Sequence, residues 1–265
     1  MNYVRLRIFN EPARDSGYSP GKGFCDLNHT LAMAKRVKAA GMKLLLDFHY
    51  SDYWADPGKQ YKPAAWNGLS FADLKKALYE YTRQVMNALK QQGTLPDIVQ
   101  TGNEINHGMV WPEGNVANMD QLAALIKAGS AAVTEVSPST ILLLHLALGG
   151  QNEESVFFID NMLARGVPFD VIGLSYYPKW HGTLDDLRYN INDLARRYKK
   201  DMVVAEYSSL KKEVNKIAFE VPNGQGKGTF IWEPLSIWEK VFDEKGKAIE
   251  GMMNVYDEIA GEFVK

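Results

Sequence analysis

Two glutamates stand at the ends of strand-like runs and could act as a pair. The run IVQTGNE ends in Glu104, and the run MVVAE ends in Glu206. Hydrolysis of a glycosidic bond needs one carboxyl group that protonates the leaving oxygen and a second that attacks the anomeric carbon or directs water at it. Glu104 and Glu206 are therefore the candidate catalytic residues, although a glutamate at a strand end is often only a capping or surface group.

Other polar residues lie on the same faces of the predicted strands. In YVRLRIF, alternation places Arg7 opposite the apolar residues, and in KLLLDFHY it places Asp47 and His49 on one face. Charged side chains inside a sheet barrel are unfavourable unless they are paired, and the two glutamates offer partners. We expect Arg7 to keep the nucleophile ionised, His49 to add hydrogen bonding, and Asn103 to donate to the sugar hydroxyl beside the reacting carbon. Arg7 could also form a structural ion pair, and His49 could be a buried core histidine.

Tryptophans follow several of the predicted strands. A row of aromatic rings on one rim would stack on the apolar faces of sugars and form a groove for a polysaccharide chain. Trp66 could belong either to such a groove or to a packed loop. The tryptophans that could form the groove are Trp54, Trp66, Trp111, Trp180 and Trp232.

Asp47 and His49 could in principle hold a metal ion. No second histidine or acidic cluster nearby in the sequence completes a hydrolase-type metal site, and His145 sits inside the apolar run LLLHLAL. The sequence therefore predicts neither a catalytic metal nor a cofactor.

Strand-like runs alternate with amphipathic helix-like runs along the whole chain. This alternation predicts a parallel sheet with helices outside it, and the active site of such a barrel lies at the carboxyl ends of the strands. Helices are predicted at 26–41, 71–93, 119–136 and 183–200, where apolar residues recur every three or four positions. Strands are predicted at 3–9, 43–50, 97–104, 140–148, 170–178, 201–208 and 227–234.

The predicted strands number seven, whereas a closed (β/α)8 barrel has eight. The missing strand belongs at the front, because the chain begins on a strand. The predicted fold class is therefore an α/β protein, a (β/α)8 TIM barrel that lacks its first strand and helix. No linker or shift in composition divides the chain, so residues 1–265 are predicted to form a single barrel domain.

Composition and charge bear on whether the chain binds nucleic acid, a membrane or a second copy of itself. The chain has 265 residues, a formal net charge of -2 and 46% hydrophobic residues. No large basic face is predicted, which argues against nucleic acid as a partner. No apolar run is long enough to cross a membrane, and no signal peptide precedes the first strand. An open barrel would expose two strand edges, through which two chains could pair as a dimer.

Several long segments resemble glycoside hydrolase family 53. They are YVRLRIFNEP, VKAAGMKLLLDFHYSDYWADPGKQYKPAAW, PDIVQTGNEINHGMVWPEG, VIGLSYYPKWHG and VVAEYS. The members of this family are arabinogalactan endo-β-1,4-galactanases, in a clan of retaining (β/α)8 glycosidases. The resemblance implies that the chain hydrolyses β-1,4-galactan, such as the galactan side chains of pectin.

The resemblance also implies roles for individual residues. By this resemblance, Glu104 occupies the position of the acid/base and Glu206 the position of the nucleophile. A supporting group would comprise Arg7, His49, Asn103, Tyr177 and Trp232, and residues near the sugar would be Asp47, Trp54 and Trp111. Some members bind calcium in a long loop. The segment 210–227 of this chain is shorter than that loop, so no calcium site is predicted. Family members are generally exported, which implies a secreted or periplasmic native form.

Two other functions stay open at this point. The first is an endo-glycosidase of the same clan that acts on mannan or glucan, and the second is an inactive, carbohydrate-binding barrel. A panel of polysaccharides separates them, because a galactan groove must accommodate the axial hydroxyl of galactose.

Overall fold

The structure is a computed structural model that describes residues 2–235 and 240–263. The chain folds as two compact parts. The N-terminal part comprises Asn2–His145 and Phe157–Asp170, and the C-terminal part comprises Leu146–Val156 and the chain from Val171 onwards. The single domain expected over residues 1–265 stays a prediction.

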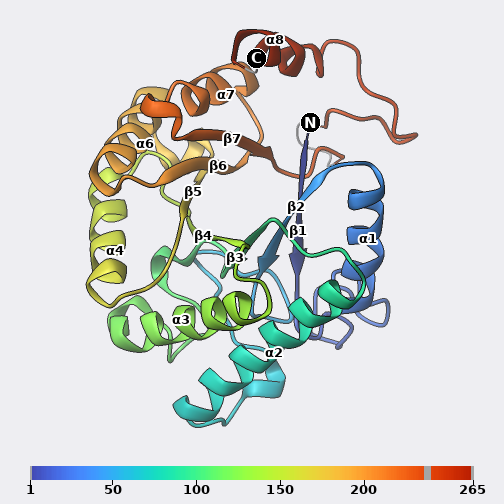
Figure 1. Ribbon diagram of the computed structural model, residues 1–265, viewed down its shortest axis with the longest axis vertical. Helices are drawn as coiled ribbons and strands as arrows, with labels where there is room; N and C mark the ends of the chain where they lie inside the picture. The colour runs from blue at the N-terminus through green and yellow to red at the C-terminus, as the bar shows by residue number, and fades with distance from the viewer. Residues whose placement is uncertain (1, 236–239, 264–265) are drawn as a thin grey trace. The chain divides into compact units, whose positions relative to one another are not determined.

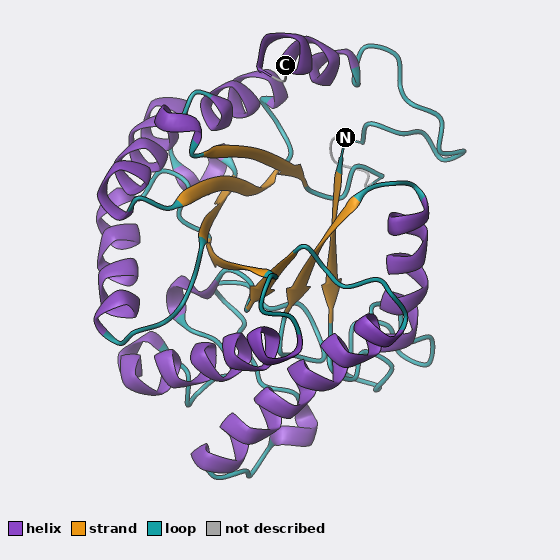
Figure 2. Ribbon diagram, viewed as in Figure 1, coloured by secondary structure: helices purple, strands orange, loops and turns teal. Residues whose placement is uncertain are grey.

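Strands and helices alternate in the N-terminal part, with the helices outside the strands (Figures 1 and 2). Strand β1 pairs in parallel with β2, β2 with β3, and β3 with β4. The strands are β1 (Tyr3–Ile8), β2 (Lys43–Phe48), β3 (Ile98–Thr101) and β4 (Ile141–Leu146). The helices are α1 (Leu27–Ala39), α2 (Phe71–Gln91) and α3 (Met119–Val136). Short 3-10 helices connect them at Ala64–Trp66, Ile105–His107 and Val116–Asn118.

The register of this ladder sets polar residues of neighbouring strands side by side. Arg7 on β1 lies opposite Asp47 on β2, and Asp47 lies opposite Gln100 on β3. Because parallel strands end at the same edge of a sheet, the segments that follow β1, β2 and β3 meet at one edge. This edge carries five of the polar residues that the sequence analysis singled out, namely Arg7, Asp47, His49, Asn103 and Glu104.

The C-terminal part repeats the same alternation. Strands β5 and β6 pair in parallel, as do β6 and β7, and the β5–β6 register shifts so that Ser175 lies opposite Glu206. Its strands are β5 (Val171–Tyr176), β6 (Asp201–Tyr207) and β7 (Gly226–Ile231). Its helices are α5 (Pro178–His181), α6 (Leu184–Tyr198), α7 (Lys211–Phe219) and α8 (Asn254–Phe263), with a 3-10 turn at Pro222–Gly224. Helix α4 (Asn152–Ala164) begins in this part and ends in the N-terminal part.

Helix α2 shows why the predicted helices form where they do. The Ser70 side chain accepts a hydrogen bond from the backbone N–H of Asp73 and so caps the first turn. Beyond the helix, Gly93 has a φ of 75°, a left-handed conformation that glycine adopts without steric cost. One stripe of the helix is buried against the sheet and the neighbouring helices, and it contains Leu74, Leu78, Val85, Met86 and Leu89.

The seven predicted strands are confirmed, each within a few residues of its expected bounds. The four predicted helices are confirmed as α1, α2, α3 and α6. Helices α4 and α7 were not singled out from the sequence. Helix α4 is weakly amphipathic, and α7 spans only Lys211–Phe219. Both features weaken a periodic signal.

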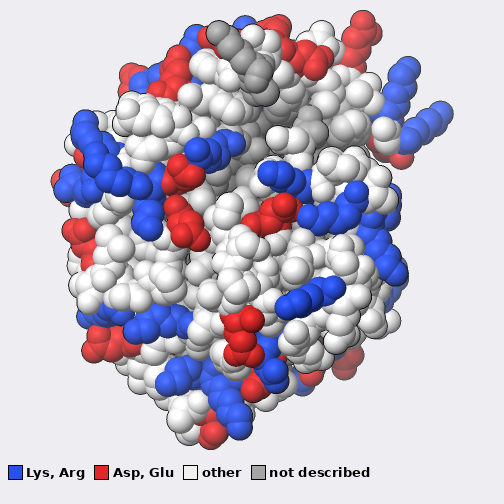
Figure 3. All heavy atoms as spheres, in the orientation of Figure 1, with Lys and Arg blue, Asp and Glu red and all other residues white. Residues whose placement is uncertain are grey.

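Surface charges of both signs are interspersed on the face drawn in Figure 3. This pattern agrees with the small net charge of -2. Within residues 2–235 and 240–263, no helix combines the length and the apolar character that a membrane span requires.

Candidate active site

A buried network of polar side chains occupies the carboxyl edge of β1–β3. Its centre is Asp47, which has no exposed surface. Asp47 accepts hydrogen bonds from Nη2 of Arg5 at 2.8 Å and from Nε2 of Gln100 at 2.6 Å, and Nε2 of His49 lies 3.1 Å from its Oδ2. Burial by itself would raise the pKa of Asp47, but the positive field of Arg5 and the contact with His49 outweigh it, so this pKa lies below its usual value. Asp47 is therefore an ionised carboxylate that orients its neighbours.

Asn103 is held by the same network. Its Oδ1 accepts from Nη2 of Arg5 at 2.7 Å and from Nε2 of Gln100 at 3.1 Å, and its Nδ2 donates to the carbonyl of Ala55 at 2.8 Å. Nδ1 of His145 lies 3.0 Å from Asn103 Oδ1. With these contacts the amide of Asn103 has one orientation, in which its nitrogen serves as the donor.

Glu104 directly follows Asn103 and lies in a tight turn. Its backbone has φ 50° and ψ 53°, the left-handed helical region that a residue with a side chain seldom adopts. Gly102, two residues earlier, has φ 101°, and a Cβ at that position would lie 2.7 Å from Cγ2 of Ile105. The turn therefore requires glycine at position 102. Backbone strain of this kind concentrates at functional sites.

Arg7 lies at the same edge beside aromatic rings. Its guanidinium donates to the hydroxyl of Tyr18 at 3.1 Å and stacks over the ring of Trp54, 4.2 Å from the centroid. Phe9 packs edge-on against both Trp54 and His49, with centroids 5.6 and 4.9 Å apart. The structure thus brings three of the predicted site residues together, namely Arg7, His49 and Trp54.

Trp111 lies beyond the Glu104 turn. Its ring nitrogen donates to the carbonyl of His107 at 3.0 Å, and its ring meets Tyr61 edge-on at 6.4 Å. The backbone N–H of Trp111 donates to the carbonyl of Gln60 at 2.6 Å. These contacts fix Trp111 to the loop that follows β2.

In the C-terminal part, Glu206 lies near the end of β6 and is only 5% exposed. Its Oε2 accepts a hydrogen bond from the hydroxyl of Tyr177 at 3.2 Å. Tyr177 is held in turn by His181, whose Nδ1 accepts from the Tyr177 backbone N–H at 3.0 Å. Burial lowers the pKa of His181 to about 4, so the ring is neutral and keeps that acceptor near neutral pH.

The other tryptophans of the predicted groove differ in burial: Trp180 is exposed, Trp232 is half-buried and Trp66 is buried. Trp232 follows β7 and its backbone N–H donates to the carbonyl of Tyr207 at 2.8 Å. Trp180 is exposed and meets Tyr177 edge-on at 5.9 Å. Trp66 is buried against Tyr81 and Tyr50, which favours the packed-loop alternative over a place in the groove.

Some residues of the network were not predicted from the sequence. Arg5 and Gln100 contact both Asp47 and Asn103, and the amide of Gln60 donates to the backbone of the Glu104 turn. Strand alternation puts Arg5 on the same face as Arg7, and Gln100 is a polar residue that follows the apolar pair Ile98 and Val99. Gln60 carries no such signal, because it lies in an irregular loop.

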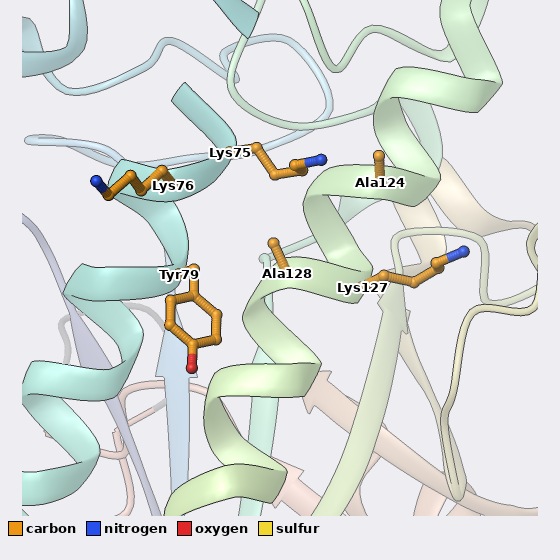
Figure 4. Close-up of a pocket in the computed structure, with 6 residues that line it drawn as sticks. All are labelled: Lys75, Lys76, Tyr79, Ala124, Lys127 and Ala128. Atoms are coloured by element: carbon orange, nitrogen blue, oxygen red, sulfur yellow. The ribbon is translucent and has the colours of Figure 1, made fainter. Parts of the chain in front are cut away.

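A separate surface groove lies on the outer side of α2 and α3. Lys75 of α2 points towards Ala124 of α3, and the lining is completed by Lys76, Tyr79, Lys127 and Ala128 (Figure 4). None of the predicted site residues lines it.

A family model and several known proteins are similar to most of this chain. Residues 1–214 match the model of glycosyl hydrolase family 53. The chain is 38% identical over 208 residues to an endo-beta-1,4-galactanase from Bacillus subtilis, covering 78% of this chain and 48% of that protein. It is 33% identical over 267 residues to arabinogalactan endo-beta-1,4-galactanase A from Aspergillus niger, covering 88% of this chain and 74% of that protein.

A solved structure extends the similarity to nearly the whole chain. The family 53 catalytic domain of Ignisphaera aggregans superposes with a TM-score of 0.89 at 34% identity, covering 98% of this chain and 85% of that one. The predicted fold class, a (β/α)8 barrel that lacks its first strand and helix, is confirmed, with seven strands in the described part of the chain. The matched family model and these relatives show that the chain belongs to glycosyl hydrolase family 53.

Proposed function

We propose that this chain is an endo-β-1,4-galactanase that cleaves galactan with retention of anomeric configuration. Membership of glycosyl hydrolase family 53 is the observation that carries this proposal. The galactanase names of the Bacillus subtilis and Aspergillus niger relatives support galactan as the substrate. The proposed substrate is the galactan of type I arabinogalactan, which occurs as side chains of pectin.

Glu206 serves as the nucleophile and Glu104 as the acid/base. A carboxylate oxygen of Glu206 attacks C1 of the sugar, while the Glu104 carboxyl group gives its proton to the leaving glycosidic oxygen. The C1–O bond breaks, the shortened galactan leaves, and a galactosyl ester on Glu206 remains. Glu104 then takes a proton from water, the resulting hydroxide attacks C1, and the ester bond to Glu206 breaks.

The surroundings of each glutamate support its role. The Tyr177 hydroxyl donates to Glu206, and a hydrogen bond to the charged form favours the carboxylate that a nucleophile needs. Glu104 is 9% exposed and follows Asn103, whose amide nitrogen is oriented by Arg5 and Gln100. That nitrogen is the donor that we assign to the sugar hydroxyl next to C1.

The roles of the other predicted residues follow their positions. Arg7 and Trp54 form a stacked pair that presents a flat surface to a sugar. Asp47 and His49 hold the network beneath it. Trp111 and Trp232 supply further stacking surfaces. Secretion and pairing of two chains through an open sheet edge stay predictions.

Conservative substitutions test the two glutamates. Glu206→Gln should abolish hydrolysis of β-1,4-galactan, and Glu104→Gln should lower it by about 10²–10⁴-fold. Glu154→Gln, on the exposed face of α4, is the matched control and should leave activity unchanged. Product sizing on galactan, mannan and glucan checks the substrate. Hydrolysis of galactan by Glu206→Gln would refute the assignment, and cleavage of mannan or glucan alone would refute the substrate.

A further inference from the structure

Gln60 makes a contact with the Glu104 turn that neither the motifs nor the comparisons assign to any role. It lies in the loop between β2 and α2, and its side chain is buried. Its Nε2 donates to the backbone carbonyl of Asn103 at 2.8 Å and to that of Glu104 at 3.3 Å. One amide group therefore holds two successive carbonyls of the turn.

Double donation of this kind depends on the backbone conformation. In an extended strand, successive carbonyls point in opposite directions, whereas in a helical conformation of either hand they point roughly the same way. Glu104 has φ 50° and ψ 53°, so the carbonyls of residues 103 and 104 can converge on one donor. The Gln60 amide thus stabilises the left-handed conformation against the extended one.

Gln60 is itself fixed in place. The backbone carbonyl of Gln60 accepts a hydrogen bond from the backbone N–H of Trp111 at 2.6 Å. The next residue, Tyr61, forms a parallel β-bridge with Trp111. The loop after β2 is therefore anchored to the segment that follows the turn, and the Gln60 side chain reaches back to the turn itself. Movement of the Glu104 backbone would break contacts on both sides.

We propose that Gln60 is a positioning residue that aims the Glu104 carboxyl group at the leaving oxygen by holding its backbone in the left-handed conformation. This inference rests on the proposed function, because it needs Glu104 to be the acid. Proton donation depends on a carboxyl group within hydrogen-bond reach of the leaving oxygen, so a small rotation at Glu104 weakens acid catalysis. Nucleophilic attack by Glu206 does not depend on this proton when the leaving group departs as a stable anion.

The dependence of rate on the leaving group separates positioning from a purely structural role. The test compares kcat/KM for phenyl, 4-nitrophenyl and 2,4-dinitrophenyl β-1,4-galactobiosides, whose leaving groups need progressively less protonation. Gln60→Met should lower kcat/KM by about tenfold or more for the phenyl substrate and by less than about twofold for the dinitrophenyl substrate. Gln60→Glu keeps the side-chain shape but loses the amide donor, so it should show the same pattern and serves if the methionine variant does not fold.

Gln225→Met is the matched control. Gln225 also donates from Nε2 to two backbone carbonyls, those of Ala195 at 3.1 Å and Lys200 at 2.8 Å, in the C-terminal part. Its loss should leave the leaving-group dependence unchanged.

Glu104→Ala distinguishes failure of this inference from failure of the proposed function. If Glu104→Ala shows no preference for good leaving groups, Glu104 is not the acid and the proposed function falls. If Glu104→Ala shows that preference but folded Gln60 variants lose activity equally on all three substrates, or lose none, Gln60 does not position the acid and this inference is overturned.

Discussion

The hydroxyl of Tyr177 donates a hydrogen bond to Oε2 of Glu206 at 3.2 Å. The tyrosine comes from the residue after β5 and the glutamate from β6, and the shifted β5–β6 register places Ser175 opposite Glu206. A donor at this place stabilises the carboxylate form of Glu206 and orients the oxygen that it contacts. The relationship makes Tyr177 the first residue to test after the glutamates.

Replacing Tyr177 by phenylalanine removes this donor and keeps the ring. A hydrogen bond to a charged group contributes about 2 kcal/mol, so kcat on galactan should fall by about 30-fold. Steady-state kinetics measures the loss. Tyr189→Phe, at an exposed position of α6, is the control and should leave kcat on galactan unchanged. An unchanged kcat for Tyr177→Phe would show that this hydrogen bond has no part in the rate-limiting step.

Asp47→Asn should destabilise the protein strongly. The variant removes the carboxylate that Nη2 of Arg5 contacts at 2.8 Å, and breaking a buried ion pair costs about 3–5 kcal/mol. The free energy of unfolding in urea gives the effect. Asp56→Asn is the control, because the Asp56–Lys59 pair is exposed and should contribute less than about 1 kcal/mol. Equal losses for the two variants would contradict the importance of the buried network.

The Asp47 substitution should also change the dependence of stability on pH. The pKa of Asp47 in the folded state lies below its unfolded value, so its contribution is present above the unfolded pKa and is lost as the pH falls through the folded pKa. The wild type should therefore lose more stability than Asp47→Asn as the pH falls below about 4. Parallel curves for the two proteins would argue that Asp47 is not ionised in the folded state.

How far the site could be predicted from the sequence depends on the kind of contact. The strand ends, Asn103, Glu104 and Glu206 follow from periodicity and from long motifs, because these signals are local. Which arginine pairs with Asp47 does not follow. Arg5 and Arg7 share a face, and Arg7 lies opposite Asp47 in the ladder, yet Arg5 makes the ion pair. That choice depends on side-chain reach across the sheet.

Two other features of the structure depend on contacts of the same kind. Gln60 reaches the Glu104 turn only because its loop is anchored at Trp111, a contact between distant segments that leaves no periodic pattern. The sequence left two positions open for Trp66, and only the ring contacts with Tyr50 and Tyr81 show that it packs in the loop. Loop contacts of this type are set by tertiary packing.

His181 should make stability sensitive to mildly acidic pH. Burial lowers its pKa from 6.5 to about 4, so the unfolded state binds more protons between these values and stability falls as the pH falls from 6.5 to 4. At about 1.4 kcal/mol per pKa unit the loss is on the order of 3 kcal/mol. His181→Asn keeps an acceptor for the Tyr177 N–H and should lack this part of the loss in urea titrations at several pH values. A wild type and variant that lose stability alike would contradict a neutral buried His181.

Gly102→Ala should distort the Glu104 turn. The added Cβ would lie 2.7 Å from Cγ2 of Ile105 and 3.1 Å from Sδ of Met109, at a φ of 101°. Stability should fall by about 1–3 kcal/mol from strain, and activity on galactan should fall further as the acid moves. Gly68→Ala separates strain from crowding, because Gly68 has φ 77° and open space around its Cβ position. Full activity in a folded Gly102→Ala protein would mean that the turn geometry is not needed for catalysis.

The proposal that Glu206 and Glu104 cleave galactan by double displacement makes a stereochemical claim. Proton NMR of the first products from β-1,4-galactan measures it, because the anomeric signal of the new reducing end can be read before mutarotation. The β-anomer should form first and convert slowly to the equilibrium mixture. Initial formation of the α-anomer, or no cleavage of galactan by the folded protein, would contradict it.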